Sequence, residues 1–146
     1  MEFLSKLYRI SLFGYLLGAL LMTACTVAPK EDVEVKRFAS VTGVKKDKLA
    51  YYKQLHAKAW PGVLKQIRVC NIQNYSIYLK EIEGQYYLFS YFEYVGDNFE
   101  ADMHKMAQHR ETQQWLKETD PCQIPLPDAA AKGAIWADME EVFHTD

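Results

Sequence analysis

The strongest strand signal in this 146-residue chain is the run QYYLFSYFEYV at residues 85–95. Tyr, Phe and Val favour extended backbone, and successive side chains of a strand point to opposite faces. The run divides into one face with Tyr86, Leu88, Ser90, Phe92 and Tyr94 and another with Tyr87, Phe89, Tyr91 and Val95. Neither face is polar, so both should be covered. Helices can cover one face of a small sheet, and we expect a second subunit to cover the other.

Further strands are expected on both sides of this run, at residues 37–44, 73–81 and 136–144. Within residues 73–81 the side chains of Tyr75, Ile77 and Leu79 share one face, and Glu83-Gly84 marks the turn into the next strand. Alternation therefore predicts a hairpin at the centre of the domain.

Helical spacing of apolar residues predicts two helices before this hairpin and two after it. The first pair spans residues 47–58, with Asp47 as N-cap, and about 61–69, with Pro61 in the first turn. The second pair comprises a helix capped by Asp97, with Phe99, Met103 and Met106 facing inward, and a helix at residues 112–118. The order β-α-α-β-β-α-α-β predicts an α+β fold, ferredoxin-like with paired helices, in residues 37–146.

The N-terminus has the layout of a secretory signal. Lys6 and Arg9 precede an apolar run, Ser11–Met22, that is too short to span a bilayer permanently. Its end, LMTAC at residues 21–25, is similar to the site at which bacterial lipoproteins receive a lipid on cysteine. We expect residues 1–24 to be removed, Cys25 to be lipidated, and residues 25–36 to form a tether. Ordinary cleavage after Ala24 is the alternative.

The predicted location is therefore the cell envelope, and Thr26 in place of Asp favours the outer membrane. The formal net charge is −2, and no basic block appears, so nucleic acid is not an expected partner. Cys70 and Cys122 have no metal-binding spacing. They could pair in an oxidising compartment, but two free thiols are favoured.

Four blocks of the chain resemble the L-rhamnose mutarotase family. They are YKQLH at residues 52–56 followed by Trp60-Pro61, NYSIYL at 74–79, TQQW at 112–115, and MEEVFH at 139–144. The resemblance implies a ferredoxin-like domain, usually a homodimer, that interconverts the α and β anomers of a sugar without a cofactor. Residues 120–123 and Trp136 look more like the branch associated with fucose catabolism. The implied substrate is a 6-deoxy-L-hexose, L-rhamnose or L-fucose.

The resemblance also implies a site. Mutarotation needs one group to take the anomeric proton and another to protonate the ring oxygen, and a histidine near neutral pKa serves in both directions. His56 is the expected acid/base, with Tyr52 one helical turn earlier on the same face. Tyr75 matches the family's sugar-contacting tyrosine, and Trp115 the first of two adjacent sugar-binding tryptophans. From spacing alone, Tyr52 and His56 would be interpreted as core residues.

The second tryptophan is a departure, because Leu116 stands there; Trp136 could supply the aromatic surface instead. Glu140 and Glu141 should face opposite sides of the last strand, so one of them could hold sugar hydroxyls or orient His56. His104 and His109, five residues apart on a helix, suit a single metal ion poorly and should be solvated.

Two other functions compete with the mutarotase. Many monooxygenases and haem-degrading proteins share a dimeric α/β-barrel plan, and fold alone does not separate them from this chain. A non-catalytic envelope protein that binds sugar or serves a structural role is the third possibility. Haem binding would favour the former, and sugar affinity without a rate effect would favour the latter.

Overall fold

The computed structural model describes residues 34–145. The predicted signal peptide, Cys25 and most of the predicted tether lie outside these residues, so the structure says nothing of them. Within the described range, no helix combines the length and apolar character that a membrane span requires.

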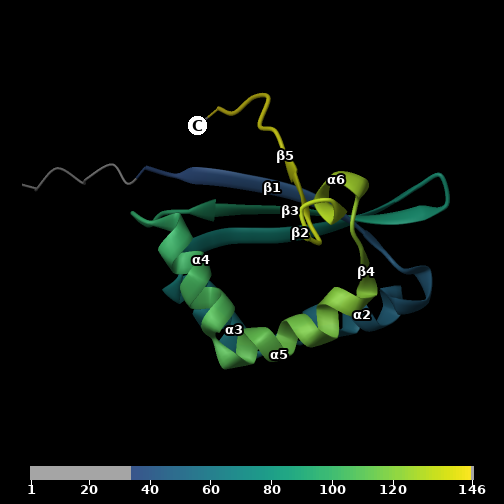
Figure 1. Ribbon diagram of the computed structural model, residues 1–146, viewed down its shortest axis with the longest axis horizontal. Coiled ribbons are helices and arrows are strands. Elements are labelled where there is room, and N and C mark those ends of the chain that lie inside the picture. Colours follow the sequence, from purple (N-terminus) through teal and green to yellow (C-terminus); the bar gives the residue numbers. More distant parts are fainter. Residues whose placement is uncertain (1–33, 146) are drawn as a thin grey trace, which may run out of the picture. The chain divides into compact units, whose positions relative to one another are not determined.

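An antiparallel sheet with the strand order β2-β3-β1-β4 forms the centre of the fold (Figure 1). Its strands are β1 (Lys36–Val44), β2 (Ile72–Ile82), β3 (Gln85–Tyr94), β4 (Gln123–Ile124) and β5 (Ala137–Met139). The short strands β4 and β5 pair in succession with the same edge of β1. The first strand in the sequence is therefore an inner strand of the sheet.

The predicted hairpin is confirmed. Strands β2 and β3 pair up to Ile82 and Gln85, which leaves Glu83 and Gly84 as a two-residue loop. Both loop residues have positive φ, +51° and +78°. Two-residue hairpin loops of this kind match the twist of the flanking strands, and glycine adopts the conformation without strain.

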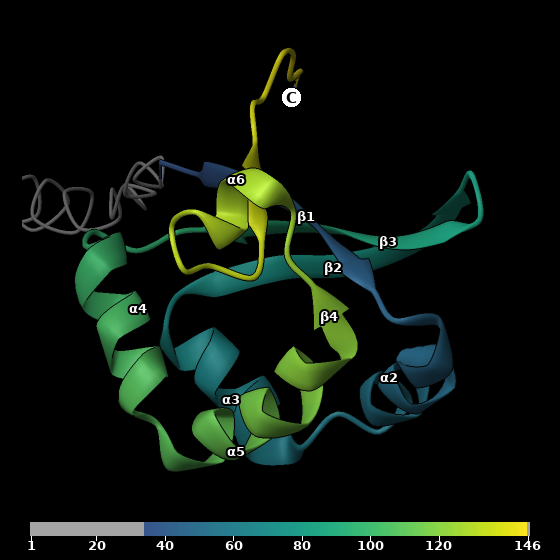
Figure 2. The ribbon, with the colours of Figure 1, turned by 45° about the vertical axis from the view of Figure 1, so that its right-hand side comes forward.

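Two pairs of helices lie against one face of this sheet (Figures 1 and 2). They are α2 (Leu49–Ala57), α3 (Pro61–Val69), α4 (Phe99–Gln108) and α5 (Arg110–Thr119), with single 3₁₀ turns at Lys46–Lys48 (η1) and Asp120–Cys122 (η2) and a short helix α6 (Pro127–Ala130). Together with the strands they confirm the predicted order of elements as a mixed α+β fold. The dimeric barrel stays a prediction.

Both predicted acidic N-caps are wrong. Asp47 lies inside the turn η1, and α2 begins after Lys48. Helix α4 is capped by Asn98, whose Oδ1 accepts a hydrogen bond of 3.0 Å from the Ala101 N–H. A capping side chain reaches the N–H three residues ahead, and Asp97 precedes that position by one residue.

The core lies between the helices and the sheet. Val44, Tyr52, Leu88 and Cys122 form its centre, each at most 4% exposed. Cys70 is also fully buried, and both cysteines are free, as predicted. The opposite face of the sheet is more open: Tyr87, Phe89 and Tyr91 are half-buried there.

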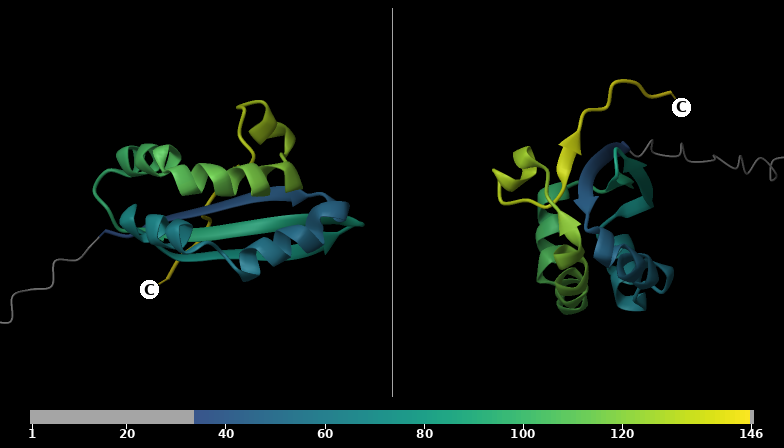
Figure 3. Two further views of the ribbon diagram at one scale, coloured as in Figure 1. Left: turned by 90° about the horizontal axis from the view of Figure 1, so that it is seen from below. Right: turned by 90° about the vertical axis from the view of Figure 1, so that its right-hand side faces the viewer.

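The last strand is shorter than predicted. Strand β5 ends at Met139, and residues 140–145 continue without regular structure on the side of the sheet away from the paired helices (Figure 3). The two consecutive carboxylates of Glu140 and Glu141 would place one charge on each face of a strand, against the alternation that a half-buried edge strand requires. The prediction that they alternate on a strand is therefore wrong.

Candidate functional site

A cavity of about 550 Å³ lies between the paired helices and β2. Side chains from α2, α3, β2 and α5 and from the connection between α2 and α3 enclose it. They are His56, Ala59, Val63, Leu64, Ile67, Arg68, Ile72, Gln73, Asn74, Tyr75, Ile77 and Trp115. Three of the four site residues predicted from the sequence, His56, Tyr75 and Trp115, thus line one cavity. The fourth, Tyr52, packs directly against His56.

His56 is held by the helix that carries it. Its Nδ1 lies 3.0 Å from the carbonyl oxygen of Tyr52, one turn earlier in α2. A carbonyl only accepts, so Nδ1 carries the hydrogen and Nε2 is left as the unprotonated nitrogen. Burial lowers the pKa of His56 below its ordinary value, although the bond to the Tyr52 carbonyl opposes that shift. The imidazole is therefore a neutral base at neutral pH.

Tyr52 lies behind His56 and is 4% exposed. The two rings stack with their centroids 4.1 Å apart. Burial, and then the neighbouring Tyr75, raise the pKa of Tyr52, whereas a hydrogen bond with the side chain of Gln123 lowers it. The phenol therefore keeps its proton at physiological pH.

Tyr75 reaches the cavity because β2 contains a bulge. Gln73 pairs with Glu93 and Ser76 with Tyr91, so two residues of β2, Asn74 and Tyr75, face the single residue between them in β3. Asn74 has a φ of +49°, the left-handed conformation that this kind of bulge uses. Bulges re-aim side chains next to functional sites.

The ring of Tyr75 contacts Phe92 edge-on, at 5.6 Å between centroids, and the residue as a whole is 44% exposed. Its hydroxyl is the buried end: burial raises the pKa of Tyr75, and a hydrogen bond with Ser90 opposes the rise. Tyr75 therefore presents a protonated hydroxyl below the cavity and an open ring face at it.

Trp115 forms the wall opposite the sheet. It is 8% exposed and meets His56 edge-on at 5.1 Å. Trp60 meets Trp115 in the same manner at 5.4 Å. The second aromatic ring beside Trp115 is therefore Trp60, the N-cap residue of α3. Sequence reasoning had considered Trp136, which packs against the core cluster instead.

A hydrogen bond joins the two helices that carry these walls. The Gly62 N–H, in the first turn of α3, donates to Oε1 of Glu111 in α5 at 3.2 Å. A Cβ atom at Gly62 would collide with that carboxylate. Because that carboxylate is the far end of a flexible side chain, a larger residue at Gly62 would displace it and break this hydrogen bond between α3 and α5.

Gln123 is a buried polar residue beside Tyr52 that sequence reasoning missed, and it lies behind the cavity rather than in its lining. It lies on β4, is 6% exposed, and hydrogen-bonds the side chain of Tyr52, while its Oε1 has no partner in the structure. Buried acceptors are usually satisfied, so this oxygen is suited to a hydroxyl donor. Its position depends on the pairing of β4 with β1, which no local pattern reveals.

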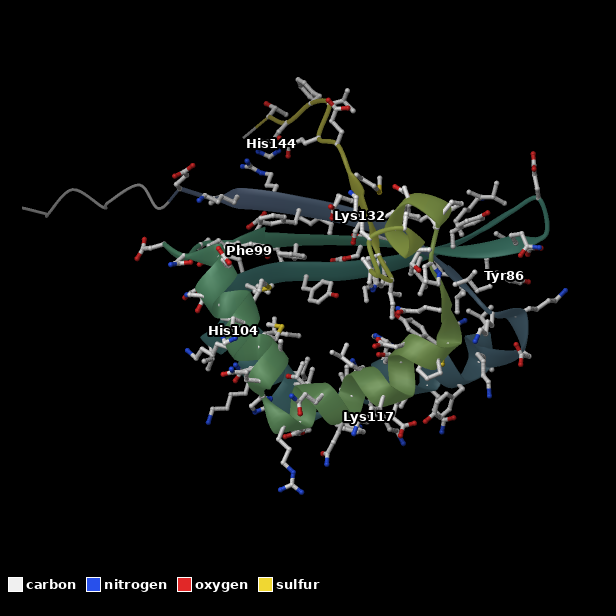
Figure 4. All side chains as sticks on the ribbon, viewed as in Figure 1. Tyr86, Phe99, His104, Lys117, Lys132 and His144 are labelled. Atoms are coloured by element: carbon white, nitrogen blue, oxygen red, sulfur yellow. The ribbon has the colours of Figure 1, made fainter. Side chains whose placement is uncertain are left out.

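The weaker sequence candidates lie elsewhere. His104 projects from the outer surface of α4, as Lys117 does from that of α5 (Figure 4). His109 caps α5: its Nδ1 accepts a hydrogen bond of 3.3 Å from the Thr112 N–H. Glu140 and Glu141 line a separate groove with His144, on the tail beyond β5. Neither carboxylate lines the cavity that contains His56.

The site can carry out proton transfer on a small polar ligand. It combines a neutral imidazole, the protonated phenol of Tyr75 and the wall formed by Trp115, with the Arg68 side chain at the rim. General acid–base chemistry needs a base and an acid held within reach of one substrate, and this arrangement supplies both.

Comparison with known proteins matches residues 37–145 to the family model for L-rhamnose mutarotase. An L-rhamnose mutarotase of Bacillus subtilis is 34% identical over 112 residues, which is 77% of this chain and 100% of that protein. One from Lactiplantibacillus plantarum is 31% identical, over 75% of this chain and 98% of that protein. The crystal structure of an L-rhamnose mutarotase from Formosa agariphila superposes with a TM-score of 0.57 at 21% identity, covering 76% of this chain and 99% of that one. This last likeness concerns the fold alone.

Proposed function

We propose that this chain, which belongs to the L-rhamnose mutarotase family, interconverts the α and β anomers of a 6-deoxy-L-hexose, either L-rhamnose or L-fucose. One observation carries the proposal: His56, with Nε2 unprotonated, lines the same cavity as Tyr75 and Trp115. The relatives named L-rhamnose mutarotase support the reaction class, and the site supports the mechanism described next.

The reaction begins when Nε2 of His56 takes the proton from the hydroxyl on C1 of the sugar. The electrons of that O–H bond form the aldehyde C=O, the bond between C1 and the ring oxygen breaks, and a tyrosine hydroxyl gives its proton to that oxygen. The open chain rotates about the C1–C2 bond. The same transfers in reverse then close the ring on the other face: the protonated His56 gives its proton to the oxygen on C1, and the tyrosine takes its proton back from the ring oxygen, so both residues return to their starting states.

The raised pKa values of Tyr52 and Tyr75 are compatible with the acid role. The sugar oxygen released by ring opening is an alkoxide, a much stronger base than a phenolate, so the phenol gives up its proton only as the bond breaks. Tyr75 lines the cavity with His56 and is the first candidate for the acid, whereas Tyr52 packs behind His56. Trp115, with Trp60 beside it, offers the apolar face of the sugar a flat surface.

Saturation-transfer NMR of anomeric protons tests the proposal across L-rhamnose, L-fucose, galactose and glucose. We expect faster exchange for at least one 6-deoxy-L-hexose than in buffer alone. Binding without any increase in exchange would replace the enzyme by a sugar-binding protein, and an absence of both would remove the proposed function.

We further propose that the protein is a homodimer through the face of the sheet opposite the paired helices. Tyr87, Phe89 and Tyr91 are half-buried on that face, and Tyr78 beside them is 64% exposed. Contiguous aromatic surface of this kind is typical of protein interfaces.

The proposed location rests on the N-terminal sequence. A signal peptide ending at Ala24 and a lipid on Cys25 would anchor the domain in the cell envelope, and the outer membrane is favoured by Thr26. A tethered mutarotase there would act on free sugars released outside the cytoplasm and supply one anomer for uptake.

A further inference from the structure

We propose that Glu93 is a positioning residue: its hydrogen bonds stabilise the bulge at Asn74, and the bulge directs Tyr75 into the cavity. The proposal rests on the function assigned above to Tyr75. Glu93 does not line the cavity, so it acts on the reaction only through its neighbours.

The bulge decides which way Tyr75 points. Ile72 pairs with Tyr94 and Ile77 with Ser90, and both isoleucines line the cavity on the helical side. Residues five apart in a regular strand face opposite sides, so one extra residue must intervene between them. Asn74 is that residue, because it alone in this stretch has a positive φ. If β2 ran regularly from Ile72, Tyr75 would point to the open face of the sheet.

The left-handed backbone at Asn74 needs support from its surroundings. Only glycine adopts this conformation freely, although asparagine tolerates it better than most residues. Such conformations persist where neighbouring contacts hold them.

Glu93 provides those contacts from the neighbouring strand. Its Oε2 accepts hydrogen bonds from Asn74 Nδ2 at 2.7 Å and from Gln73 Nε2 at 2.9 Å. Its Oε1 accepts one from the Tyr91 hydroxyl at 3.1 Å, which orients the carboxylate from the other side. The carboxylate therefore hydrogen-bonds to both the bulged residue, Asn74, and the residue before it, Gln73.

The charge state suits this role. The donors Gln73 and Asn74, followed by Tyr91 and Arg37, hold the pKa of Glu93 below its usual range. Glu93 is thus a carboxylate at neutral pH and accepts with both oxygens. Its side chain is only half-buried, so core packing does not account for these bonds.

The first test is a double-mutant cycle on anomer exchange, measured on the full chain. Glu93→Ala should lower kcat/KM by between about 10-fold and 100-fold, as expected when a substrate contact is misplaced by about 1 Å. In a Tyr75→Ala background the same change should alter kcat/KM by less than about twofold. Equal losses in the two backgrounds would overturn the proposal, since a merely structural role lowers activity regardless of Tyr75.

Two companion variants separate the contribution of Asn74 from that of the other residues that hydrogen-bond to Glu93. Tyr91→Phe removes one bond to the same carboxylate without touching Asn74 or any residue that lines the cavity, and should leave kcat/KM within about threefold. Asn74→Gly adopts positive φ unaided. Combined with Glu93→Ala, it should restore most of the lost rate, and no restoration would contradict the mechanism. Thermal melts by circular dichroism establish that each variant is folded at the assay temperature.

A second measurement needs no activity and so separates this proposal from the proposed function. In ¹⁵N-tyrosine-labelled protein, the amide peak that disappears in Tyr75→Phe identifies Tyr75. Glu93→Ala should shift that peak strongly while the peak of Tyr51, on α2, stays in place. If the wild-type protein does not accelerate the anomer exchange of any sugar but this shift occurs, the proposed function is wrong and the positioning of Tyr75 by Glu93 is supported. If the Tyr75 peak does not move, Glu93 does not position Tyr75, whatever the activity of the variant.

Discussion

The Nδ1 atom of His56 lies 3.0 Å from the carbonyl oxygen of Tyr52, so one turn of helix α2 selects which ring nitrogen is free to act as a base. The helix that orients the imidazole also supplies Tyr52, whose ring stacks on it. Base and neighbouring phenol are therefore a rigid unit on a regular element, the kind of placement that proton transfer favours.

Replacing His56 should remove most of the catalysis. General acid–base assistance is typically worth about 10²–10⁴-fold, so His56→Ala should reduce anomer exchange by about that factor and leave the fold intact. Tyr75→Phe keeps the ring and loses one hydroxyl, so its loss should be smaller. The measurement is saturation-transfer NMR with the uncatalysed rate subtracted at constant buffer and pH. A folded His56→Ala protein that exchanges anomers at the wild-type rate would refute the assignment.

The rate should fall on the acid side only. Protonated His56 cannot accept the anomeric proton, and because burial lowers its pKa below about 6.5, activity should persist to a lower pH than an exposed histidine would allow. Well below that pKa, the rate should drop about tenfold per pH unit. The raised pKa values of Tyr52 and Tyr75 keep both phenols protonated up to about pH 9, so no alkaline loss is expected there. A profile of kcat/KM between pH 4 and 9 that declines toward high pH instead would contradict this assignment of roles.

The wall formed by Trp115 should contribute binding more than chemistry. Trp115→Phe retains a smaller ring, and loss of part of a contact made equally before and during reaction raises KM with little change in kcat. We expect KM to rise several-fold, up to about tenfold for an interaction of this type. Trp136→Phe is the matched control, because Trp136 packs in the core away from the cavity. A change confined to kcat would show that Trp115 acts on the transition state instead.

Assembly should depend on the open face of the sheet. Phe89→Glu places a charge at the centre of that face and should convert the homodimer into a monomer in sedimentation experiments on residues 27–146 at micromolar concentration. Leu116→Glu is the control, since Leu116 is an apolar side chain, 41% exposed, on helix α5. A wild-type protein that sediments only as a monomer would count against the interface itself.

The lipid anchor gives a prediction for the precursor in its native host. Cys25→Ser should abolish labelling by a fatty-acid analogue and move the protein out of the detergent phase. Cys70→Ser and Cys122→Ser are suitable controls, because both thiols are buried in the folded domain and should leave labelling unchanged. Detergent partitioning that is unaltered in Cys25→Ser would exclude lipidation at this residue.

Elements specified by neighbouring residues were predictable from the sequence. The alternation in residues 85–95 and the Glu83-Gly84 turn define a hairpin without reference to the rest of the chain. The spacing of Tyr52 and His56 predicted that both lie on one face of a helix, and they do. The family resemblance, rather than the spacing, is the basis for the prediction that this face is a site, and Tyr52 also belongs to the core cluster.

Features that depend on distant partners were not predictable. The bulge at Asn74 is fastened by Glu93 of another strand, and β4 exists as a strand only because β1 pairs with it. Trp60 reaches Trp115 through the packing of α3 on α5, 55 residues apart in the sequence. Strand β5 was instead predicted to be too long from its local pattern. That pattern suggested a strand through residue 144, but β5 ends at Met139, just before the two adjacent carboxylates.

The inner position of β1 constrains when this domain can fold. Its pairing partners are β3, β4 and β5, and the last of them ends at Met139, seven residues before the C-terminus. Contacts between residues so far apart in sequence are slow to form, because a long loop must close before they stabilise anything. During synthesis β1 cannot complete its pairing before β5 has been made, so the sheet is complete only when residues up to Met139 have left the ribosome. Under the proposed export through a narrow translocation channel, which admits unfolded polypeptide, that delay would give the chain time to pass before it folds.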